Sequence, residues 1–184
     1  MTNNLDLNTA LIRLESNSLE EQAAALDEAT VMLKEFGKRV VDRFVRSDDR
    51  YIIWERLIRF GWYLIDPLKE VLSHTEDPEI RDLSAILLLK LGDKTGVPIL
   101  LDIISTGEEW VCQAAFRLAE AQIVEAGDRM IERLKVLEFT NKLHLEGVLC
   151  LLTTLKKMGR TLPPDLVERF QGADAPWEVR MYLK

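Results

Sequence analysis

Apolar residues recur at helical spacing along most of the chain, and short polar or glycine-containing segments separate the runs. The clearest stretch extends from Asp77 to Ile104. Asp77 followed by Pro78 is typical of a helix start, because the carboxylate can accept backbone hydrogen bonds and proline fits the first turn. An apolar stripe follows up to Leu91, and Gly92 is typical of a helix end. A second apolar run then completes a predicted helical hairpin.

Three segments of this stretch carry a family resemblance. Asp77-Pro78-Glu79-Ile80-Arg81, Leu91-Gly92-Asp93 and Val97-Pro98-Ile99-Leu100-Leu101 together resemble a HEAT repeat, in particular the short bacterial repeats first named for phycobilisome lyases. The resemblance implies an all-α fold, in which paired helices stack into a right-handed α-solenoid (an α-α superhelix). First helices would lie on the convex side and second helices on the concave side. It implies no activity, because one fold hosts many functions.

The neighbouring stretches read as imperfect copies of this hairpin. A single domain of about five HEAT-like hairpins is therefore predicted over residues 1–184. The predicted boundaries are a degenerate first hairpin at about 7–45, then 48–73, 77–105, 107–137 and 140–171, and a C-terminal capping helix at 175–184. In the capping helix, Glu178-Val179-Arg180 matches Glu79-Ile80-Arg81.

The first hairpin is predicted to consist of two helices separated by Gly37. Ser18 and Glu21 form a capping box at its start. The residues expected to face inward are Leu19, Ala23, Leu26, Thr30, Leu33 and Phe36 in the first helix and Val40, Val41 and Phe44 in the second. In the next hairpin the expected inward residues are Ile52, Ile53, Leu57 and Phe60, with Gly61 at the helix end.

Composition narrows the class of protein. The net charge is −7, from 31 acidic and 24 basic residues. This acidity disfavours general nucleic-acid binding, which needs a basic surface, and suits a basic protein partner. No apolar run approaches a membrane span, and the N-terminal residues do not resemble a signal peptide. Cys112 and Cys150 fall within helical patterns and are expected to be buried, reduced thiols of a cytoplasmic protein.

The sequence predicts no catalytic residue, metal ligand or cofactor. His74 and His144 are the two histidines, and neither has a cysteine or carboxylate at a spacing typical of metal ligands. Glycine-rich phosphate loops and a nucleophile elbow are missing. An enzyme is therefore not favoured, although side chains distant in sequence could still meet in space.

One carboxylate recurs at the same register of every predicted second helix. Aligning these helices by their apolar pairs, with Leu68-Lys69 in place of a pair in the second hairpin, puts Asp42, Glu70, Asp102, Glu132 and Glu168 at one position. Arg43, Arg133 and Arg169 immediately follow three of them. Two interpretations stay open: a solvated helix face, or an acidic groove that recognises a basic ligand. The interleaved arginines would weaken the field of such a groove.

Two tryptophans are further candidates for partner binding. Trp62 is expected in a turn and Trp110 in the first turn of a helix, where side chains are often exposed. Packing between repeats is the alternative, because tryptophan is highly buried on average. With Arg133 and the five acidic residues they form the predicted binding set. Arg81 and Arg180 are instead interpreted as structural, each bonding to the next repeat.

Three functions remain open at this point. The first is a non-catalytic protein-binding module that uses the concave face, such as an adaptor or a toxin-immunity protein. The second is an enzyme-associated repeat protein, either a bilin-lyase-like subunit or a DNA-repair glycosylase-like protein, and the acidity argues against the latter. The third is an assembly component that self-associates through its terminal helices.

Overall fold

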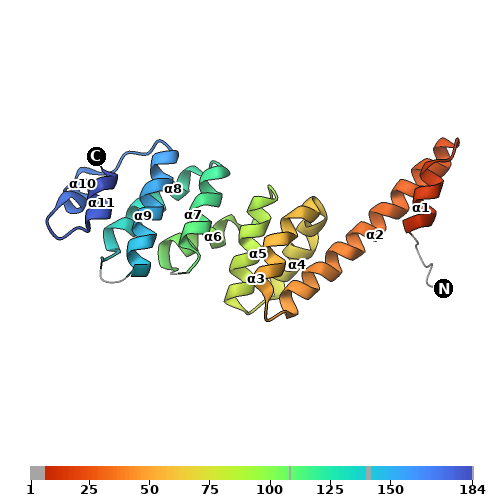
Figure 1. Ribbon diagram of the computed structural model, residues 1–184, viewed down its shortest axis with the longest axis horizontal. Coiled ribbons are helices and arrows are strands. Elements are labelled where there is room, and N and C mark those ends of the chain that lie inside the picture. Colours follow the sequence, from red (N-terminus) through yellow and green to blue (C-terminus); the bar gives the residue numbers. More distant parts are fainter. Residues whose placement is uncertain (1–6, 108, 140–141, 184) are drawn as a thin grey trace. The chain divides into compact units, whose positions relative to one another are not determined.

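The computed structural model describes residues 7–107, 109–139 and 142–183. All regular elements within these ranges are helices, which confirms the predicted all-α class (Figure 1). The chain divides into two compact units, residues 1–74 and residues 75–184. We call them the N-terminal unit and the C-terminal unit and describe each by itself. One repeat domain of about five hairpins stays a prediction.

The N-terminal unit is built around one long helix. Its elements are α1 (Leu7–Leu14), α2 (Leu19–Arg46), α3 (Arg50–Leu57), the 3-10 helix η1 (Ile58–Leu64) and α4 (Ile65–His74). The predicted cap of α2 is present, because the Ser18 hydroxyl accepts a hydrogen bond from the Glu21 N–H at 3.4 Å. Helix α1 packs against α2, and so do α3, η1 and α4. Its buried side chains include Val41, Phe44, Leu57, Leu64 and Leu68.

The predicted helix stop at Gly37 is wrong, because α2 continues through this residue to Arg46. A Cβ atom at Gly37 would lie 2.9 Å from the carbonyl oxygen of Tyr63. The glycine therefore permits η1 to approach the helix closely, which is the other common reason for glycine in a helix. Gly92 does end a helix as predicted, and its φ of 90° is one that favours glycine.

The predicted inward face of the first hairpin is also wrong over most of its length. Val41 and Phe44 are buried, but the earlier apolar residues are not. The exposed residues among those expected to face inward in the first hairpin are Leu19, Ala23, Leu26, Leu33 and Phe36. In the next hairpin Ile52 and Phe60 are exposed as well. The physical reason is that α1 packs on a different side of α2, around the buried Ala25, and leaves the predicted face uncovered.

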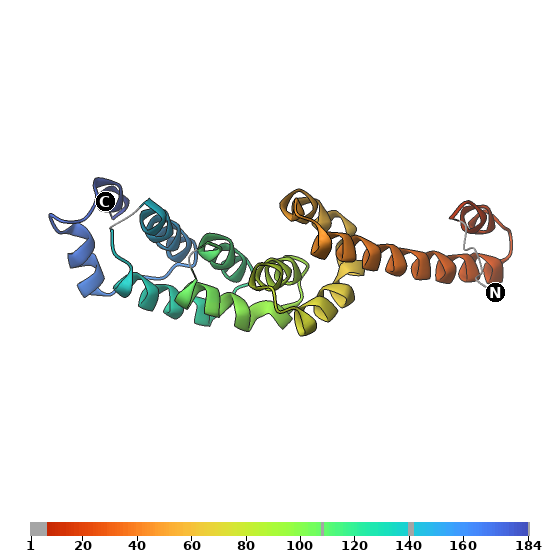
Figure 2. The same cartoon turned by 90° about the horizontal axis from the view of Figure 1, so that it is seen from below.

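The C-terminal unit consists of short helices in layers. Its elements are α5 (Pro78–Lys90), the 3-10 helix η2 (Lys94–Gly96), α6 (Val97–Thr106), α7 (Val111–Glu120), α8 (Val124–Val136), α9 (Lys142–Lys157), α10 (Pro164–Gln171) and α11 (Trp177–Tyr182). Helix α7 packs between α5 and α9, while α6 packs against α8 (Figure 2). Alternate helices of this unit therefore lie side by side.

Two arginines fasten neighbouring helices of the C-terminal unit to each other. Arg133 of α8 donates hydrogen bonds to the carbonyl oxygens of Ser105 at 3.1 Å and Gly107 at 3.0 Å, at the end of α6. Arg169 of α10 donates to the carbonyl oxygens of Leu134 and Lys135, both at 2.8 Å, and of Leu137, at the end of α8. The last carbonyls of a helix lack partners within it, and a cation is favoured there. We call these two arginines the arginine clamps.

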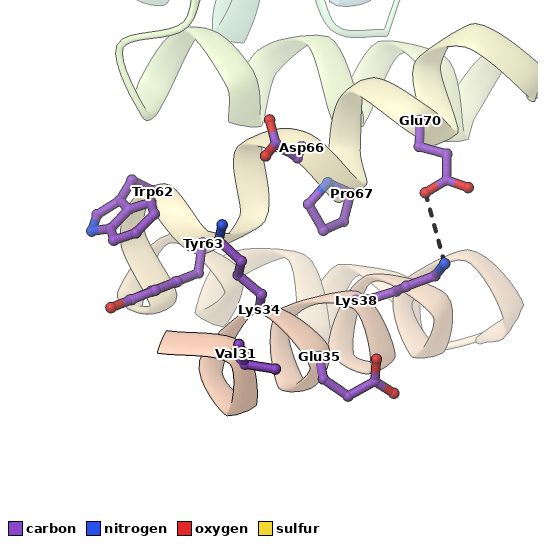
Figure 3. Close-up of a pocket in the computed structure, with 9 residues that line it drawn as sticks. All are labelled: Val31, Lys34, Glu35, Lys38, Trp62, Tyr63, Asp66, Pro67 and Glu70. Atoms are coloured by element: carbon purple, nitrogen blue, oxygen red, sulfur yellow. Dashed lines mark ion pairs between the residues drawn. The ribbon is translucent and has the colours of Figure 1, made fainter. Parts of the chain in front are cut away.

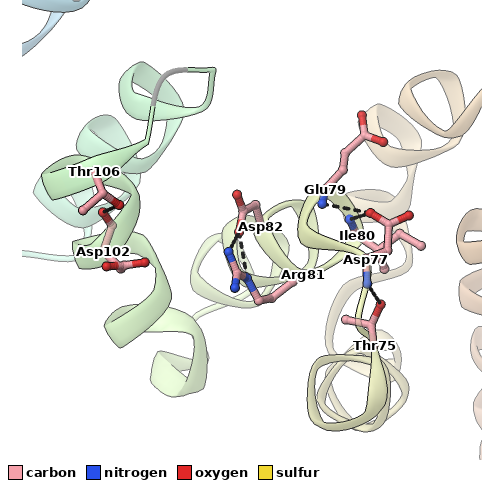
Figure 4. Close-up of polar contacts among 8 residues, drawn as sticks. All are labelled: Thr75, Asp77, Glu79, Ile80, Arg81, Asp82, Asp102 and Thr106. Carbon is pink, nitrogen blue, oxygen red and sulfur yellow. Dashed lines mark hydrogen bonds and ion pairs between the residues drawn. The ribbon is translucent and has the colours of Figure 1, made fainter.

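Helix α5 shows the strongest local agreement between sequence and structure. The Asp77 carboxylate accepts hydrogen bonds from the N–H groups of Glu79 at 2.9 Å and Ile80 at 3.2 Å (Figure 4). Residues 83–89 are all buried. The expectation for Arg81 is wrong, because this side chain pairs with the adjacent Asp82 at 3.0 Å on the same helix.

Candidate functional site

The N-terminal unit contains a groove between α2 on one side and η1 and α4 on the other, which we call the α2–α4 groove. Its main hollow measures about 380 Å³ and adjoins a second of about 240 Å³. Lys38, Pro67 and Glu70 line both hollows, so the groove is continuous. The other lining residues of the first hollow are Val31, Lys34, Glu35, Trp62, Tyr63 and Asp66 (Figure 3). Those of the second hollow are Val41, Asp42, Val71 and His74.

Two stacked aromatic rings stand at one end of the groove. Trp62 and Tyr63 have ring centroids 3.9 Å apart at an interplanar angle of 28°. They belong to η1, where the chain bends at Gly61 through a φ of 63°. Trp62 is 58% exposed, so the alternative interpretation, packing between repeats, is wrong for this residue. An exposed indole face attracts cations and adds apolar contact area.

The charges of the groove are unequal. Four carboxylates line it, those of Glu35, Asp42, Asp66 and Glu70, against the two ammonium groups of Lys34 and Lys38. Lys38 Nζ lies 3.9 Å from Glu70 Oε2, and both side chains are more than half exposed. Such a long, solvated ion pair is weak, so a ligand cation can compete for the Glu70 carboxylate.

The structure brings together only part of the predicted acidic row. Asp42 and Glu70 line the α2–α4 groove of the N-terminal unit. Asp102, Glu132 and Glu168 are exposed on α6, α8 and α10 of the C-terminal unit. Glu132 accepts a hydrogen bond from Lys135 at 2.7 Å, which raises the pKa of Lys135. Each carboxylate of the row is solvated, and Asp42 and Glu70 also share a concave surface.

The sequence predicted Arg133 as a binding residue, but in the structure its side chain serves as an arginine clamp. Its side chain is partly buried, and its guanidinium nitrogens Nη1 and Nη2 donate to the end of α6. Arg169 acts in the same way on α8. The arginines that follow the carboxylates at these two positions therefore fasten helices.

A separate hollow of about 470 Å³ lies in the C-terminal unit. Its lining residues are Asp77, Pro78, Glu79, Asp82, Ile103, Gly107, Glu109 and Trp110. Burial raises the pKa of Asp82, the Arg81 hydrogen bond opposes this shift, and the nearby Asp102 carboxylate adds to it (Figure 4). Trp110, at the start of α7, is half-buried. Asp77 and Asp82 already serve the helix cap and the Arg81 ion pair, which makes this hollow the weaker candidate.

The two thiols lie next to each other on α7 and α9. The side-chain hydrogen bond from Cys150 lowers the pKa of Cys112. The same contact, together with burial, raises the pKa of Cys150. Both cysteines are half-buried rather than buried, which corrects the expectation. The thiolate is the reactive form of cysteine, so the lowered pKa gives Cys112 a larger thiolate fraction at a given pH.

Among the described residues, no three His, Cys, Asp or Glu side chains are grouped so that they could hold a metal ion. The ring of His74 lies 2.8 Å from the Glu70 carbonyl oxygen of its own helix. No helix in the described ranges is long and apolar enough to cross a membrane.

Several residues of the α2–α4 groove were not predicted from the sequence. Lys34 and Lys38 lie one helical turn apart on α2, and Asp66 lies one turn after Trp62 on the facing wall. For Tyr63 the sequence contained one signal, namely its position directly after Trp62, a predicted binding residue. The pairing of the two walls depends on the close approach at Gly37, which the sequence suggested was a helix stop.

Comparisons of the chain with protein-family models, with curated proteins and with solved structures found no match. The assignment of function therefore depends on the surfaces described above.

Proposed function

We propose that this protein is a non-catalytic protein-binding module, and that the α2–α4 groove binds a partner segment carrying an arginine or lysine side chain. The observation that supports this most directly is the Trp62–Tyr63 stack, with Trp62 exposed, in the same hollow as the carboxylates of Asp66 and Glu70 (Figure 3). Aromatic faces and carboxylates together form the usual surroundings of a bound guanidinium or ammonium group.

The magnitudes favour a peptide over a small ion. A cation over an indole contributes about 0.5–2 kcal/mol, and an exposed ion pair about 0–1 kcal/mol. Neither contribution alone produces a stable complex. A segment lying along both hollows would add contacts with Pro67 and Val71, as well as with Asp42 and Glu70. We therefore propose an extended segment of a basic protein as the ligand.

The wider architecture and biological role belong to the same proposal. Alternate helices of the C-terminal unit lie side by side and are joined by the arginine clamps, which supports a HEAT-like α-solenoid. A small acidic protein of this kind suits a cytoplasmic adaptor or a toxin-immunity protein that inhibits a basic partner. No observation favours the bilin-lyase-like or glycosylase-like alternative.

The experiment is selection of a random-peptide display library on the immobilised full-length chain. We expect enrichment of peptides containing arginine or lysine, with affinity that falls as salt is raised. Trp62→Ala and Glu70→Lys should each weaken binding of the selected peptides by about tenfold or more. Enrichment of acidic or uncharged peptides would contradict the proposal.

Matched controls are available on the same chain. Trp177 is 65% exposed on α11, outside the groove, so Trp177→Ala removes an equally exposed indole. Glu132→Lys reverses a row carboxylate of the C-terminal unit. Both variants should bind the selected peptides as the unaltered chain does. If Glu132→Lys weakens binding as much as Glu70→Lys, the ligand depends on the whole row and not on the groove.

A further inference from the structure

The apolar stripe of α2 is covered at one end and bare at the other. Ala23, Thr30, Gly37 and Phe44 follow one another at intervals of seven residues, so they lie on one side of the helix. Gly37 and Phe44 are buried within the N-terminal unit, but Ala23 is exposed. Leu19, Leu26 and Leu33 run beside this line and are 82%, 56% and 42% exposed. An uncovered apolar stripe of this length marks an interaction surface.

Helix α1 does not cover the stripe, although it packs against the same part of α2. Its contact lies around the buried Ala10 and Ala25. Arg13 Nη1 of α1 forms an ion pair with Glu28 Oε1 at 2.6 Å on that side. The stripe therefore stays open beside a helix pair that is already fixed.

The stripe has the alternation of a two-helix seam. The large residues Leu19, Leu26 and Leu33 alternate with the smaller residues Ala23 and Thr30, up to the buried Gly37. The Thr30 hydroxyl donates to the Leu26 carbonyl oxygen at 2.9 Å, so it needs no further partner from outside the helix. In an antiparallel pair Leu26 and Leu33 each pack beside a smaller residue of the other helix, which fills the open part of the seam. A parallel pair would stack leucine on leucine and alanine on alanine.

The charges beside the seam select the same orientation. Glu20, Asp27 and Lys34 each follow a leucine of the seam and are exposed. The sign thus changes from negative to positive along one flank. In an antiparallel pair this flank faces the same flank of the second copy, which runs in the opposite direction. Glu20 of one copy therefore lies opposite Lys34 of the other. In a parallel pair Glu20 and Lys34 would be about 21 Å apart.

We propose that two copies of this chain associate through the α2 stripe as an antiparallel, two-fold symmetric pair. Leu26 packs beside Thr30 of the second copy, and Leu33 beside its Ala23. The two-fold axis makes both contacts occur twice, as in any pair of identical surfaces. The same alignment places Asp27 opposite its own copy near the axis, so Asp27→Asn should strengthen the association. This surface is separate from the cation-binding proposal for the groove and does not depend on it.

Sedimentation velocity of the full chain over a range of concentrations tests the pairing. We expect a reversible dimer, and Leu26→Glu should raise its dissociation constant by about 100-fold or more, because two carboxylates enter the seam. Val31→Glu is the matched control, since Val31 is 55% exposed and lies about 140° around the same helix. That variant should dimerise normally. Circular dichroism checks that each variant keeps its helix content.

A charge exchange tests the orientation. Glu20→Lys and Lys34→Glu should each weaken the dimer, and the double variant should restore it, because opposite charges face each other again. Lys34 also lines the groove, so these variants are judged by sedimentation alone. Leu26→Glu should leave peptide binding intact and Trp62→Ala should leave the dimer intact, which separates the two proposals.

Three results would overturn the inference. One is a monomer at every concentration, whether the stripe is then bare or covered by another protein. The second is a dimer that Leu26→Glu does not weaken. The third is a double charge variant no better than the single ones.

Discussion

The two units differ in how far neighbouring helices cover an apolar helix stripe. In the C-terminal unit the apolar stripes are covered by successive helices, and residues 83–89 of α5 are buried on all sides. In the N-terminal unit a stripe with equally regular spacing stays exposed over its first half. The difference lies in the neighbouring helices and not in the stripe itself. An apolar stripe thus shows that a helix needs a partner, without showing whether the same chain supplies it.

The largest expected difference is the stability cost of removing a leucine from each unit. Leu88 is fully buried in α5, whereas Leu26 is exposed on α2. Leu88→Ala should lower the free energy of unfolding by about 2–5 kcal/mol through lost burial and a cavity. Leu26→Ala should change it by less than about 0.5 kcal/mol in dilute solution, where the dimer is dissociated. Denaturant unfolding followed by circular dichroism measures both, and equal losses would contradict the contrast between the units.

The arginine clamps of the C-terminal unit provide a second test of the difference between the two units. Arg133→Gln withdraws the guanidinium from the carbonyl oxygens of Ser105 and Gly107. We expect a loss of about 1–3 kcal/mol, because hydrogen bonds from a charged donor are lost at a partly buried helix end. Faster amide hydrogen exchange in α6 and α8 should accompany it. Arg43→Gln is the control, since Arg43 holds the corresponding place in the sequence alignment but is exposed on α2. A similar loss in both variants would mean that the clamp contributes nothing specific.

A substitution at Gly37 tests why α2 contains a glycine and still continues as one helix. Gly37→Ala should destabilise the N-terminal unit by about 1 kcal/mol, because the clash with the Tyr63 carbonyl oxygen outweighs the gain in helix propensity. If Gly37 merely interrupted a helix, alanine would instead be neutral or stabilising. Thermal unfolding compared with Gly92→Ala, whose φ of 90° is strained for alanine, gives a reference for an actual helix end.

The sequence predicted well what depends on neighbours along the chain. The Asp77 cap, the start of α5 at Pro78 and the positive φ of Gly92 are all local effects of a few residues. The α2–α4 groove was not predicted, because it depends on where η1 meets α2. The role of Arg133 was missed for the same reason, since its acceptors lie 26 and 28 residues earlier. Periodicity gives the side of a helix that is apolar, and only tertiary packing decides which part of that side is covered.

The smallest effect concerns the thiols, and it reports on the C-terminal unit alone, because both cysteines of the chain lie there. Hydrogen bonding from Cys150 lowers the pKa of Cys112, while the pKa of Cys150 is raised. As pH rises, Cys112 should therefore form its thiolate first, and iodoacetamide should alkylate it at lower pH than Cys150. Cys150→Ala removes the hydrogen bond, so alkylation of Cys112 should shift to higher pH. Mass spectrometry of the alkylated peptides measures both curves. Earlier modification of Cys150, or an unshifted curve for Cys112 in Cys150→Ala, would show that α7 and α9 do not hold the two thiols in contact.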